Sequence, residues 1–332
     1  MKKITSLVIL LTLVWIVKGE LGSQFDTIVA QHGHGNFKRI TEAVKAAPSN
    51  SKLKYYIHIK AGTYVEKVII GREKTNLVFI GEGMDMTIIT GNRSNRAGYS
   101  TSASATVDIF GEGFIAKNIT FINSAGAGNG QAVAVKSSSM FSAFYQCRFK
   151  GYQDTLYVHS GIQFYRECEI FGTVDFIFGD ARVVFQKCGM YVRLPGNTNV
   201  ITAQGRGTSL DSGGISIHNC TIAATKEFNS HLGIKAYLGR PWGRFSKVVI
   251  MQSFLDDIID PEGWLQWGND TSSLYYGEYN NTGVGASLAK RVKWKGRKRM
   301  DLVQAKKFTV RNFIYGQKWL NPTKIPYSLD FM

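Results

Sequence analysis

Short apolar runs recur along the chain with a period near 20–30 residues, and Gly, Asn or Ser residues separate them. Three of the runs align on a cysteine, at Cys147, Cys168 and Cys188, which lie 21 and 20 residues apart. Further runs fit the same template: NLVFIG (76–81), NITFIN (118–123), IHNCTI (217–222) and IMQSFL (250–255). Helical periodicity is weak throughout this region. The pattern therefore predicts a few short strands in each repeat and no intervening helices.

A repeat of this length, made of short β runs, predicts a parallel β-helix. Each repeat would form one coil of about three strands, and the coils would stack at the strand spacing of about 4.8 Å. A propeller blade needs about 40 residues and fits the interval less well. The segment NFKRITEAVKAAP (36–48) is the one clear amphipathic helix, and we expect it to cap the open end of the first coil.

The first residues have the order of a secretory signal peptide. Two lysines precede an apolar run from Val8 to Val17, and the small residue Gly19 follows it. A membrane anchor needs about 20 apolar residues, so this run is short for one. We therefore expect a signal peptide at residues 1–19 and a single domain at residues 20–332, in a secreted protein.

Export allows disulfide bonds, and the coil register suggests which cysteines could form them. Residues one coil apart lie nearly over one another, within the Cα separation of about 4.4–6.8 Å that a disulfide requires. We expect the pairs Cys147–Cys168 and Cys188–Cys220. A Cys168–Cys188 bond and a ladder of buried free thiols are the alternatives.

The chain is strongly basic, with 40 Lys and Arg against 24 Asp and Glu and a net charge of +16. In a secreted protein this charge favours a polyanionic polysaccharide of the wall matrix over nucleic acid. The densest basic stretch, KRVKWKGRKR (290–299), could be a docking patch or a solvated face. Asn-x-Ser/Thr sequons predict a glycoprotein; they begin at Asn92, Asn118, Asn219, Asn269 and Asn280.

Two aspartates, Asp154 and Asp175, each lie in an apolar, aromatic run, although Asp is seldom buried without a partner. They are 21 residues apart, which is one coil, so their carboxyl groups should lie about 5 Å apart on one face. Gln131 and Gln153, 22 residues apart, should stack in the same way. Two acids and two amides are thus expected in one patch.

Such a patch suits ester chemistry. Two close carboxyl groups do not both ionise readily, so one can act as an acid while the other acts as a nucleophile. Neutral amides can stabilise a developing oxyanion. Arg240 could hold one aspartate ionised, and Trp242 offers a face for a sugar ring. The alternative is a buried polar ladder that serves only folding.

Several long motifs occur in an order that resembles the plant-type pectin methylesterases, carbohydrate esterases of family 8. They are GTYVEKV (62–68), GQAVAV (130–135), YQDTLYVHS (152–160), GTVDFIFGDA (172–181), TAQGR (202–206), YLGRPWGR (237–244) and YYGEYNNTGVGA (275–286). The resemblance covers nearly the whole chain after residue 19. It implies a right-handed parallel β-helix that hydrolyses methyl esters of homogalacturonan to pectate and methanol.

The resemblance also assigns roles to the catalytic residues. Asp175 corresponds to the nucleophile, Asp154 to the general acid and base, and Gln153 to the oxyanion stabiliser. It implies no cofactor and no bound metal. It further implies an extracellular monomer in the cell wall that acts on pectin, with a protein inhibitor as a further partner and with no nucleic acid or membrane contact.

Four residues correspond to substrate contacts: Gln131, Arg240, Trp242 and, with different flanking residues, Thr101. Asp180 and Arg182 stand where relatives usually have Asn and Ala, and we expect Arg182 to affect the pH optimum or the substrate pattern. The long inhibitor-like region that precedes the β-helix in many relatives is expected to be absent.

Two other functions fit the same fold. A pectate lyase would need an acidic calcium cluster, and a polygalacturonase would need carboxyl groups about 6.5–9.5 Å apart. Neither of these activities requires the paired glutamines. A non-catalytic wall-binding β-helix is the remaining alternative, because a fold alone does not determine function.

Overall fold

The structure is a computed structural model that describes residues 25–196, 198–227, 233–268 and 270–332. The predicted signal peptide at residues 1–19 lies outside the described residues. Among those described, no helix has the length and apolar character needed to cross a membrane.

All the strands of the described residues belong to three parallel sheets, which we call sheets A, B and C. Sheet A contains β1 (Thr27–Val29), β2 (Tyr55–Ile59), β5 (Leu77–Gly81), β8 (Ile115–Lys117), β11 (Ser142–Tyr145), β14 (Ile162–Arg166), β17 (Arg182–Gln186), β20 (Gly214–His218), β23 (Lys247–Met251), β25 (Tyr275–Tyr279) and β26 (Arg297–Arg299). Sheet B contains β3 (Gly62–Val65), β6 (Thr87–Gly91), β9 (Thr120–Asn123), β12 (Arg148–Lys150), β15 (Glu169–Gly172), β18 (Gly189–Val192), β21 (Thr221–Ala224) and β24 (Phe254–Leu255). Sheet C contains β4 (Val68–Ile70), β7 (Val107–Ile109), β10 (Val135–Ser137), β13 (Leu156–Val158), β16 (Ile177–Gly179), β19 (Thr198–Gln204) and β22 (Lys235–Pro241).

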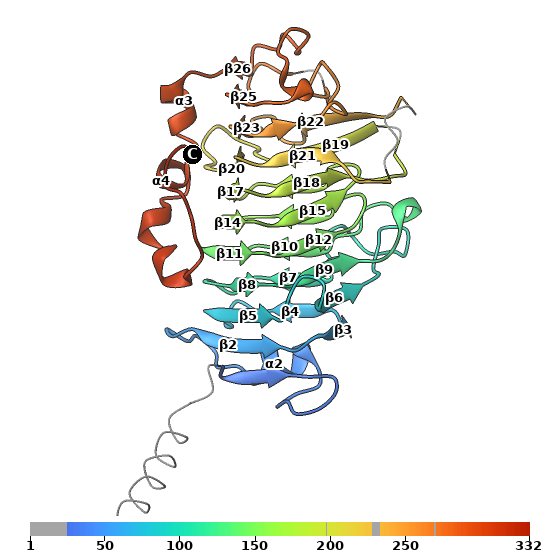
Figure 1. The fold of residues 1–332 in the computed structure, drawn as a ribbon, viewed down its shortest axis with the longest axis vertical. Coiled ribbons are helices and arrows are strands. Elements are labelled where there is room, and N and C mark those ends of the chain that lie inside the picture. Colours follow the sequence, from blue (N-terminus) through green and yellow to red (C-terminus); the bar gives the residue numbers. More distant parts are fainter. Residues whose placement is uncertain (1–24, 197, 228–232, 269) are drawn as a thin grey trace, which may run out of the picture.

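The chain visits the three sheets in turn, so each repeat of the sequence makes one coil and the coils stack along the long axis (Figure 1). Each strand pairs in parallel with the strand one coil later; in sheet A, for example, Phe164 lies opposite Val184. The winding is right-handed, as parallel crossovers almost always are. The prediction of a right-handed parallel β-helix is confirmed.

One backbone feature repeats at the corner between sheets A and B. A single residue there adopts the left-handed conformation, which turns the chain sharply between two strands. These residues are Asn118, Gln146, Glu167, Lys187, Asn219, Gln252 and Asn280, with φ between 49° and 59°. The residue that follows each of them can then point into the core, and four of those residues are the cysteines.

The four cysteines form a column of buried free thiols, so the predicted disulfides are wrong. Each sulfur donates to a backbone carbonyl of the preceding coil; Cys168 Sγ, for example, lies 3.5 Å from Phe144 O. Parallel strands in register hold neighbouring Cα–Cβ bonds side by side, pointing the same way. A short Cα separation was therefore not enough, because a disulfide also needs its Cβ atoms turned toward each other.

The thiol column leads to a first prediction. We expect the unfolded protein to react with four equivalents of a thiol reagent without prior reduction, and the folded protein to react with none, because all four cysteines are buried. A reducing agent should leave the melting temperature unchanged. Reaction of only two thiols, or of none, in the unfolded protein would show that disulfides form after all.

Aromatic rings stack along the interior in the same register. Phe144 lies 4.6 Å from Tyr165 at an interplanar angle of 4°, and Tyr165 lies 4.7 Å from Phe185 at 22°. All three side chains are fully buried. Stacked rings of this kind add to the stability gained from burial, and they keep successive coils in register.

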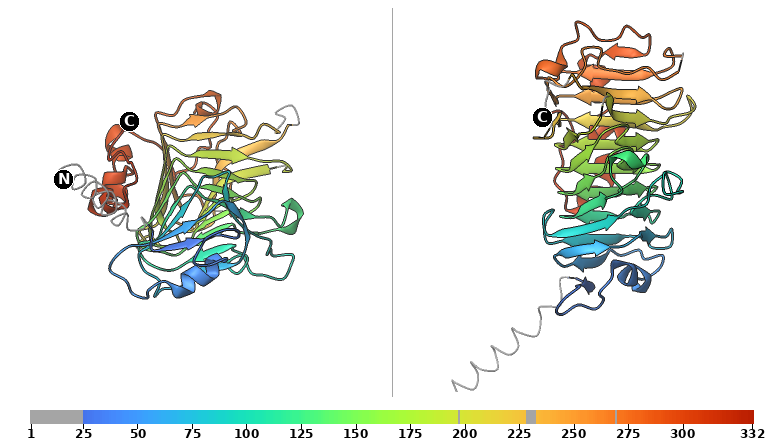
Figure 2. Two further views of the ribbon diagram at one scale, coloured as in Figure 1. Left: turned by 60° about the horizontal axis from the view of Figure 1, so that its bottom comes forward. Right: turned by 90° about the vertical axis from the view of Figure 1, so that its right-hand side faces the viewer.

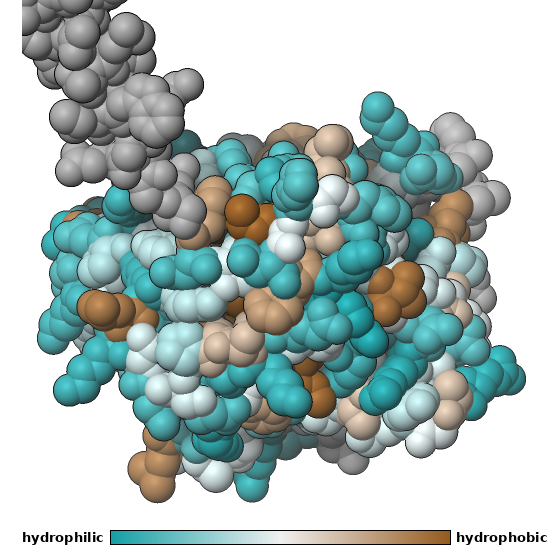
Figure 3. Space-filling model, turned by 90° about the horizontal axis from the view of Figure 1, so that it is seen from below, coloured by the Kyte–Doolittle hydropathy of each residue, from teal (hydrophilic) through white to brown (hydrophobic). Residues whose placement is uncertain are grey.

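The N-terminal end is closed by α2 (Ile40–Ala46), as predicted for residues 36–48. Ile40, Ala43 and Val44 are buried in the main core. The Glu66 carboxylate accepts hydrogen bonds from the amides of Ile40 and Thr41, at 2.9 and 3.0 Å, where the helix dipole favours negative charge. Seen from this end, the visible surface is mainly hydrophilic, with scattered apolar side chains (Figure 3).

The C-terminal segment packs on the outer face of sheet A (Figure 2). It contains α3 (Leu302–Lys306) and α4 (Val310–Phe313), and the short 3₁₀ helices η4 (Gly316–Lys318) and η5 (Asn321–Thr323). Two further 3₁₀ helices, η1 (Ala127–Asn129) and η3 (Val284–Ala286), lie in loops. Phe308 and Phe313 join a second apolar cluster with Phe164 and Val184 of sheet A. This cover leaves the outer face of sheet C free for a site.

Candidate active site

Asp154 and Asp175 lie in equivalent positions on neighbouring coils of sheet C. Each precedes a sheet C strand by two residues, and these strands pair in register, Leu156 opposite Ile177. Both aspartates are left-handed, with φ of 63° and 51°, a conformation that Asp adopts more readily than most residues. Their exposed fractions are only 7% and 5%. The coil register therefore places two nearly buried carboxyl groups side by side.

Arg240 forms a two-pronged ion pair with one of these acids. Its Nε lies 2.8 Å from Asp175 Oδ1 and its Nη2 lies 2.6 Å from Oδ2. The guanidinium also lies 4.0 Å from the centre of the Trp267 ring. Paired hydrogen bonds of this kind fix both the position and the charge of a carboxylate.

The surroundings separate the titration of the two carboxyl groups. Burial, with a contribution from the charge of Asp175, raises the pKa of Asp154 to about 8. Burial also raises the pKa of Asp175, but hydrogen bonds and charge from Arg240 oppose that shift. Asp175 therefore ionises first, while Asp154 retains its proton at neutral pH.

The raised pKa of Asp154 predicts a stability change that depends on pH. In the unfolded chain this carboxyl group ionises near its ordinary pKa of 3.8 instead of about 8. Between these values the folded state binds the extra proton, so the free energy of unfolding falls as pH rises. We expect Asp154→Asn to remove this loss, which is at most about 5 kcal/mol at pH 8. The melting temperature should therefore rise by up to roughly 10 °C at about pH 8, but not below about pH 4.

Thermal melts of Asp154→Asn and of the wild type across this pH range test the prediction. Asp257→Asn is a matched control, because Asp257 is exposed in the folded chain. A gain in melting temperature of the same size at both ends of the range would contradict the assigned protonation state.

The two predicted glutamines lie beside the acids with their amides free. Gln131 and Gln153 line the same cavity, and each is partly exposed. Their backbones are anchored, since the Gln153 carbonyl accepts from Ala132 N at 3.2 Å and the Gln131 carbonyl from Asn95 N at 2.9 Å. Neither side-chain amide has a hydrogen-bond partner within the described part of the chain. Both can therefore donate to a bound molecule.

These groups surround one cavity of about 490 Å³, which all seven predicted site residues line. Thr101 forms part of its rim, together with the neighbouring serines 100 and 102. Trp242 is 48% exposed and packs against Gly205, where a Cβ atom would lie 2.7 Å from the indole ring. The cavity thus combines aromatic side chains with a few placed polar and charged groups, as ligand-binding sites commonly do.

Three aromatic residues of the cavity were missed by the sequence analysis. Tyr157 and Phe178 stack at 4.2 Å and form part of the wall next to the aspartates. They lie opposite one another in β13 and β16, so the coil register applied to the outward positions could have found them. Trp267 lies in an irregular loop, and no repeat in the sequence indicates its position.

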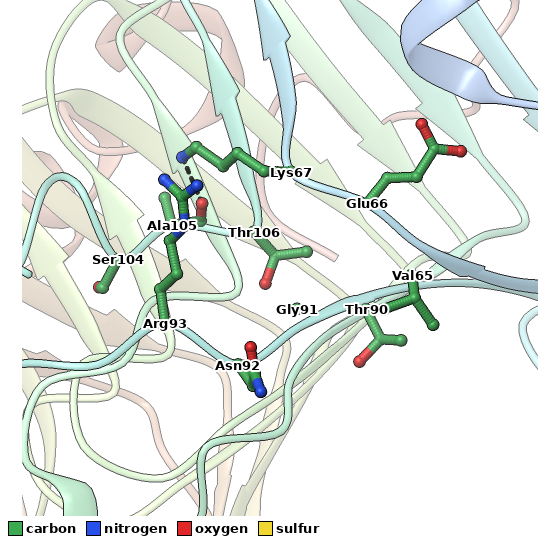
Figure 4. A pocket seen from close by; sticks show the side chains of 10 residues that line it. All are labelled: Val65, Glu66, Lys67, Thr90, Gly91, Asn92, Arg93, Ser104, Ala105 and Thr106. Atoms are coloured by element: carbon green, nitrogen blue, oxygen red, sulfur yellow. Dashed lines mark hydrogen bonds between the residues drawn. The ribbon is translucent and has the colours of Figure 1, made fainter. Parts of the chain in front are cut away.

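A smaller cavity of about 190 Å³ lies near the N-terminal end, at the ends of β3 and β6 (Figure 4). Lys67 and Arg93 converge there, and Lys67 donates to the Ala105 carbonyl. None of the predicted catalytic residues lines this cavity. The described residues also contain no group of three or more His, Cys, Asp or Glu side chains suited to a metal ion.

A sequence model described as Pectinesterase matches residues 26–317. The chain belongs to the pectinesterase family. It is 52% identical over 317 residues to "Pectinesterase/pectinesterase inhibitor PPE8B" of Prunus persica, covering 93% of this chain and 61% of that protein. It is 50% identical to "Pectinesterase 2" of Citrus sinensis, covering 91% of this chain and 60% of that protein. The chain therefore spans about 60% of the length of these curated relatives.

The family assignment extends to a solved structure. "Pectin methylesterase from Carrot" is 45% identical and superposes with a TM-score of 0.91, covering 93% of this chain and 99% of the carrot chain. The pectinesterase fold thus accounts for nearly all of the carrot chain.

Proposed function

We propose that this member of the pectinesterase family is a carboxylic ester hydrolase that converts methyl esters of homogalacturonan in pectin to pectate and methanol. The observation that carries the proposal is the pair of buried carboxyl groups on adjacent coils, of which only Asp175 is paired with Arg240. This arrangement supplies a nucleophile and an acid at the same pH. The names of the relatives support the same reaction.

In the first step, Asp175 attacks the carbonyl carbon of the methyl ester. Arg240 keeps Asp175 ionised and oriented, and the free amides of Gln131 and Gln153 donate to the oxyanion of the tetrahedral intermediate. The intermediate collapses by breaking the bond to the methoxy group, which takes the proton of Asp154 and leaves as methanol. The product of this step is an anhydride between Asp175 and the galacturonate.

In the second step, water hydrolyses the anhydride. Asp154, now ionised, removes a proton from water as it attacks the acyl carbon. Cleavage of the anhydride restores ionised Asp175 and releases the galacturonate carboxyl group. Each residue returns to its starting state, and the ester has been exchanged for an acid and methanol.

The exposed tryptophans suit the sugar rings of the polymer. Trp242 and Trp267 are 48% and 44% exposed and stand at the same cavity as the acids. Aromatic faces pack well on the apolar faces of sugar rings while the hydroxyl groups stay in water. We assign these two residues and Thr101 to substrate positioning, with Gln131 shared between substrate and oxyanion.

The alternative activities receive less support. A lyase would use a calcium cluster, and no metal-binding group of the required size occurs in the described residues. A polygalacturonase would need a wider gap between its carboxyl groups than the strand spacing of about 4.8 Å provides. A purely binding role would not require two buried carboxyl groups with different pKa values, one protonated and one ionised at the same pH.

Methanol release from highly methylated pectin, measured with and without calcium, tests the proposal. We expect methanol in both conditions and no change in polymer length. Unsaturated or shortened products would favour a lyase or a polygalacturonase. Binding of pectin without methanol release would favour the wall-binding alternative.

We also propose that the protein acts outside the cell in the wall, as a monomer, and that a protein inhibitor can cover its cleft. The sequon asparagines Asn92 and Asn280 are exposed and suit glycosylation, whereas Asn118 and Asn219 are only partly exposed. Asn269 lies outside the described residues. A mobility shift after glycosidase treatment of the secreted protein would test the glycan assignment.

A further inference from the structure

A further cavity, lined by cations and aromatic rings, lies between sheet A and the C-terminal helices. It has a volume of about 370 Å³, within the range of small-molecule sites. Arg182 lines it together with Lys247 and Lys307. Arg182 and Lys247 begin β17 and β23, and Lys307 follows α3, so three separate elements bring positive charge to one place.

None of these three cations has a carboxylate partner among the residues that the structure describes. Arg182 Nε makes one long hydrogen bond, 3.4 Å to Ser212 O, and the side chains of Lys247 and Lys307 make none. By contrast, Arg291 forms an ion pair with Glu278 at 3.0 Å. Grouped cations repel one another, and a bound anion would reduce that repulsion.

Lys247 shows this repulsion directly. Burial and the nearby charges of Arg206 and Arg182 lower its pKa to about 8. Asp180 is the acid that opposes this shift, but its Oδ1 already accepts from Gln204 Nε2 at 2.8 Å. The ammonium group is therefore part of a cluster in which positive charges outnumber the carboxylate of Asp180.

An aromatic ring stands at the same cavity. Tyr315 is 46% exposed, and its ring lies between Arg182 at 5.5 Å and Lys318 at 5.6 Å. Its φ of 51° is left-handed, which is uncommon for a bulky residue and is often found where a side chain is held for binding. Tyr315 thus presents a ring face beside the unpaired cations.

We propose that this cavity is a second binding site, separate from the catalytic cavity, for a free carboxylate of de-esterified galacturonate. Arg182, Lys247 and Lys307 would hold the carboxylate, and Tyr315 would pack on the sugar ring. A methyl-esterified residue is uncharged at this position and would be rejected. The inference rests on the proposed function, whose product is this acidic sugar, because the product of the reaction would then bind to the enzyme that makes it.

The location supports a link between the two sites. Sheet C strand β16 follows directly after Asp175, and the chain then turns at Asp180 into β17, which begins with Arg182. The two cavities share no lining residue. A polymer with free carboxylates could therefore be held at one corner of the β-helix while its next ester reaches the cleft on sheet C.

Labelling of Lys247 with an amine reagent tests the site, with modified peptides quantified by mass spectrometry. The probes are unmethylated trigalacturonate, its fully methylated form and inorganic phosphate. With trigalacturonate at ten times its Kd we expect labelling of Lys247 to slow about tenfold, because about a tenth of the sites stays free. Labelling is carried out in the Asp175→Asn variant so that the methylated probe is not hydrolysed. Methylated trigalacturonate should then not protect Lys247, and exposed Lys293 should label at the same rate throughout.

Two variants with the same loss of charge sharpen the result. Arg182→Gln should weaken the protection of Lys247 by about tenfold in Kd, as expected for the loss of a charged hydrogen-bond donor. Lys293 lies in the basic 290–299 stretch and does not line the cavity, so Lys293→Gln should leave the protection of Lys247 unchanged. Equal weakening by both variants would indicate general charge attraction and overturn the site.

The remaining outcomes separate this inference from the proposed function. No protection of Lys247, or equal protection by phosphate, would overturn the uronate site even if methanol is released. Protection by trigalacturonate alone would support it even if methanol release failed, and only the proposed reaction would then fall.

Discussion

Asp175→Asn is expected to reduce methanol release from pectin by about 10⁴-fold while the protein stays folded. The substitution keeps the shape of the side chain but removes the ionised oxygen that attacks the ester. The backbone at this position has a φ of 51°, which Asn tolerates as well as Asp. Methanol assays at saturating pectin, together with thermal melts, would measure both parts of the prediction.

Asp180→Asn is the matched control for this variant. Asp180 lies five residues further along, beyond β16, and does not line the catalytic cavity. Its hydrogen bond with Gln204 can be kept by an amide oxygen. We expect nearly full activity from this control, whereas full activity from Asp175→Asn would reject the nucleophile assignment.

Arg240→Met is expected to lower kcat/KM by about 10²–10³-fold near neutral pH and to move the acid limb of the pH profile upward. Without Arg240, Asp175 loses two charged hydrogen bonds. Burial raises the pKa of Asp175 and Arg240 lowers it, so removing Arg240 should raise that pKa further. Since the nucleophile must be ionised, a higher pKa of Asp175 means that activity appears only at higher pH.

A pH profile of kcat/KM for Arg240→Met, Arg240→Lys and the wild type separates charge from geometry. Lysine keeps the positive charge but cannot form the paired hydrogen bonds that Arg240 makes to Asp175. The acid limb of Arg240→Lys should therefore lie between those of the wild type and Arg240→Met. A large loss of activity with no movement of the acid limb would mean that Arg240 acts on the substrate and not through Asp175.

The coil register made much of this site predictable from sequence. One rule, that residues about 21 positions apart stack, placed Asp154 over Asp175 and Gln131 near Gln153. These residues come from turns and strands that repeat, and their spacing survives in the sequence. The position of Trp267 could not be predicted from the sequence, because its loop follows no repeat and its place depends on how the last coils pack.

The C-terminal cover was also missing from the sequence interpretation. Helices α3 and α4 have only 5 and 4 residues, too few for helical periodicity to stand out. Their presence was indirectly visible in β14 and β17, where consecutive residues such as Phe164 and Tyr165 are apolar, as in strands buried on both faces. The disulfide prediction failed for another reason, since it considered Cα separation alone.

The position of Arg240 in β22 has a consequence for when the enzyme becomes active. A ribosome makes both aspartates well before it makes the coil that carries the arginine, and each coil rests only on its neighbours. A nascent chain, or one cut before residue 240, would contain both aspartates but would lack the arginine that keeps Asp175 ionised. By the loss expected for Arg240→Met, such a chain would work about 10²–10³-fold more slowly until the coil that carries Arg240 winds into place.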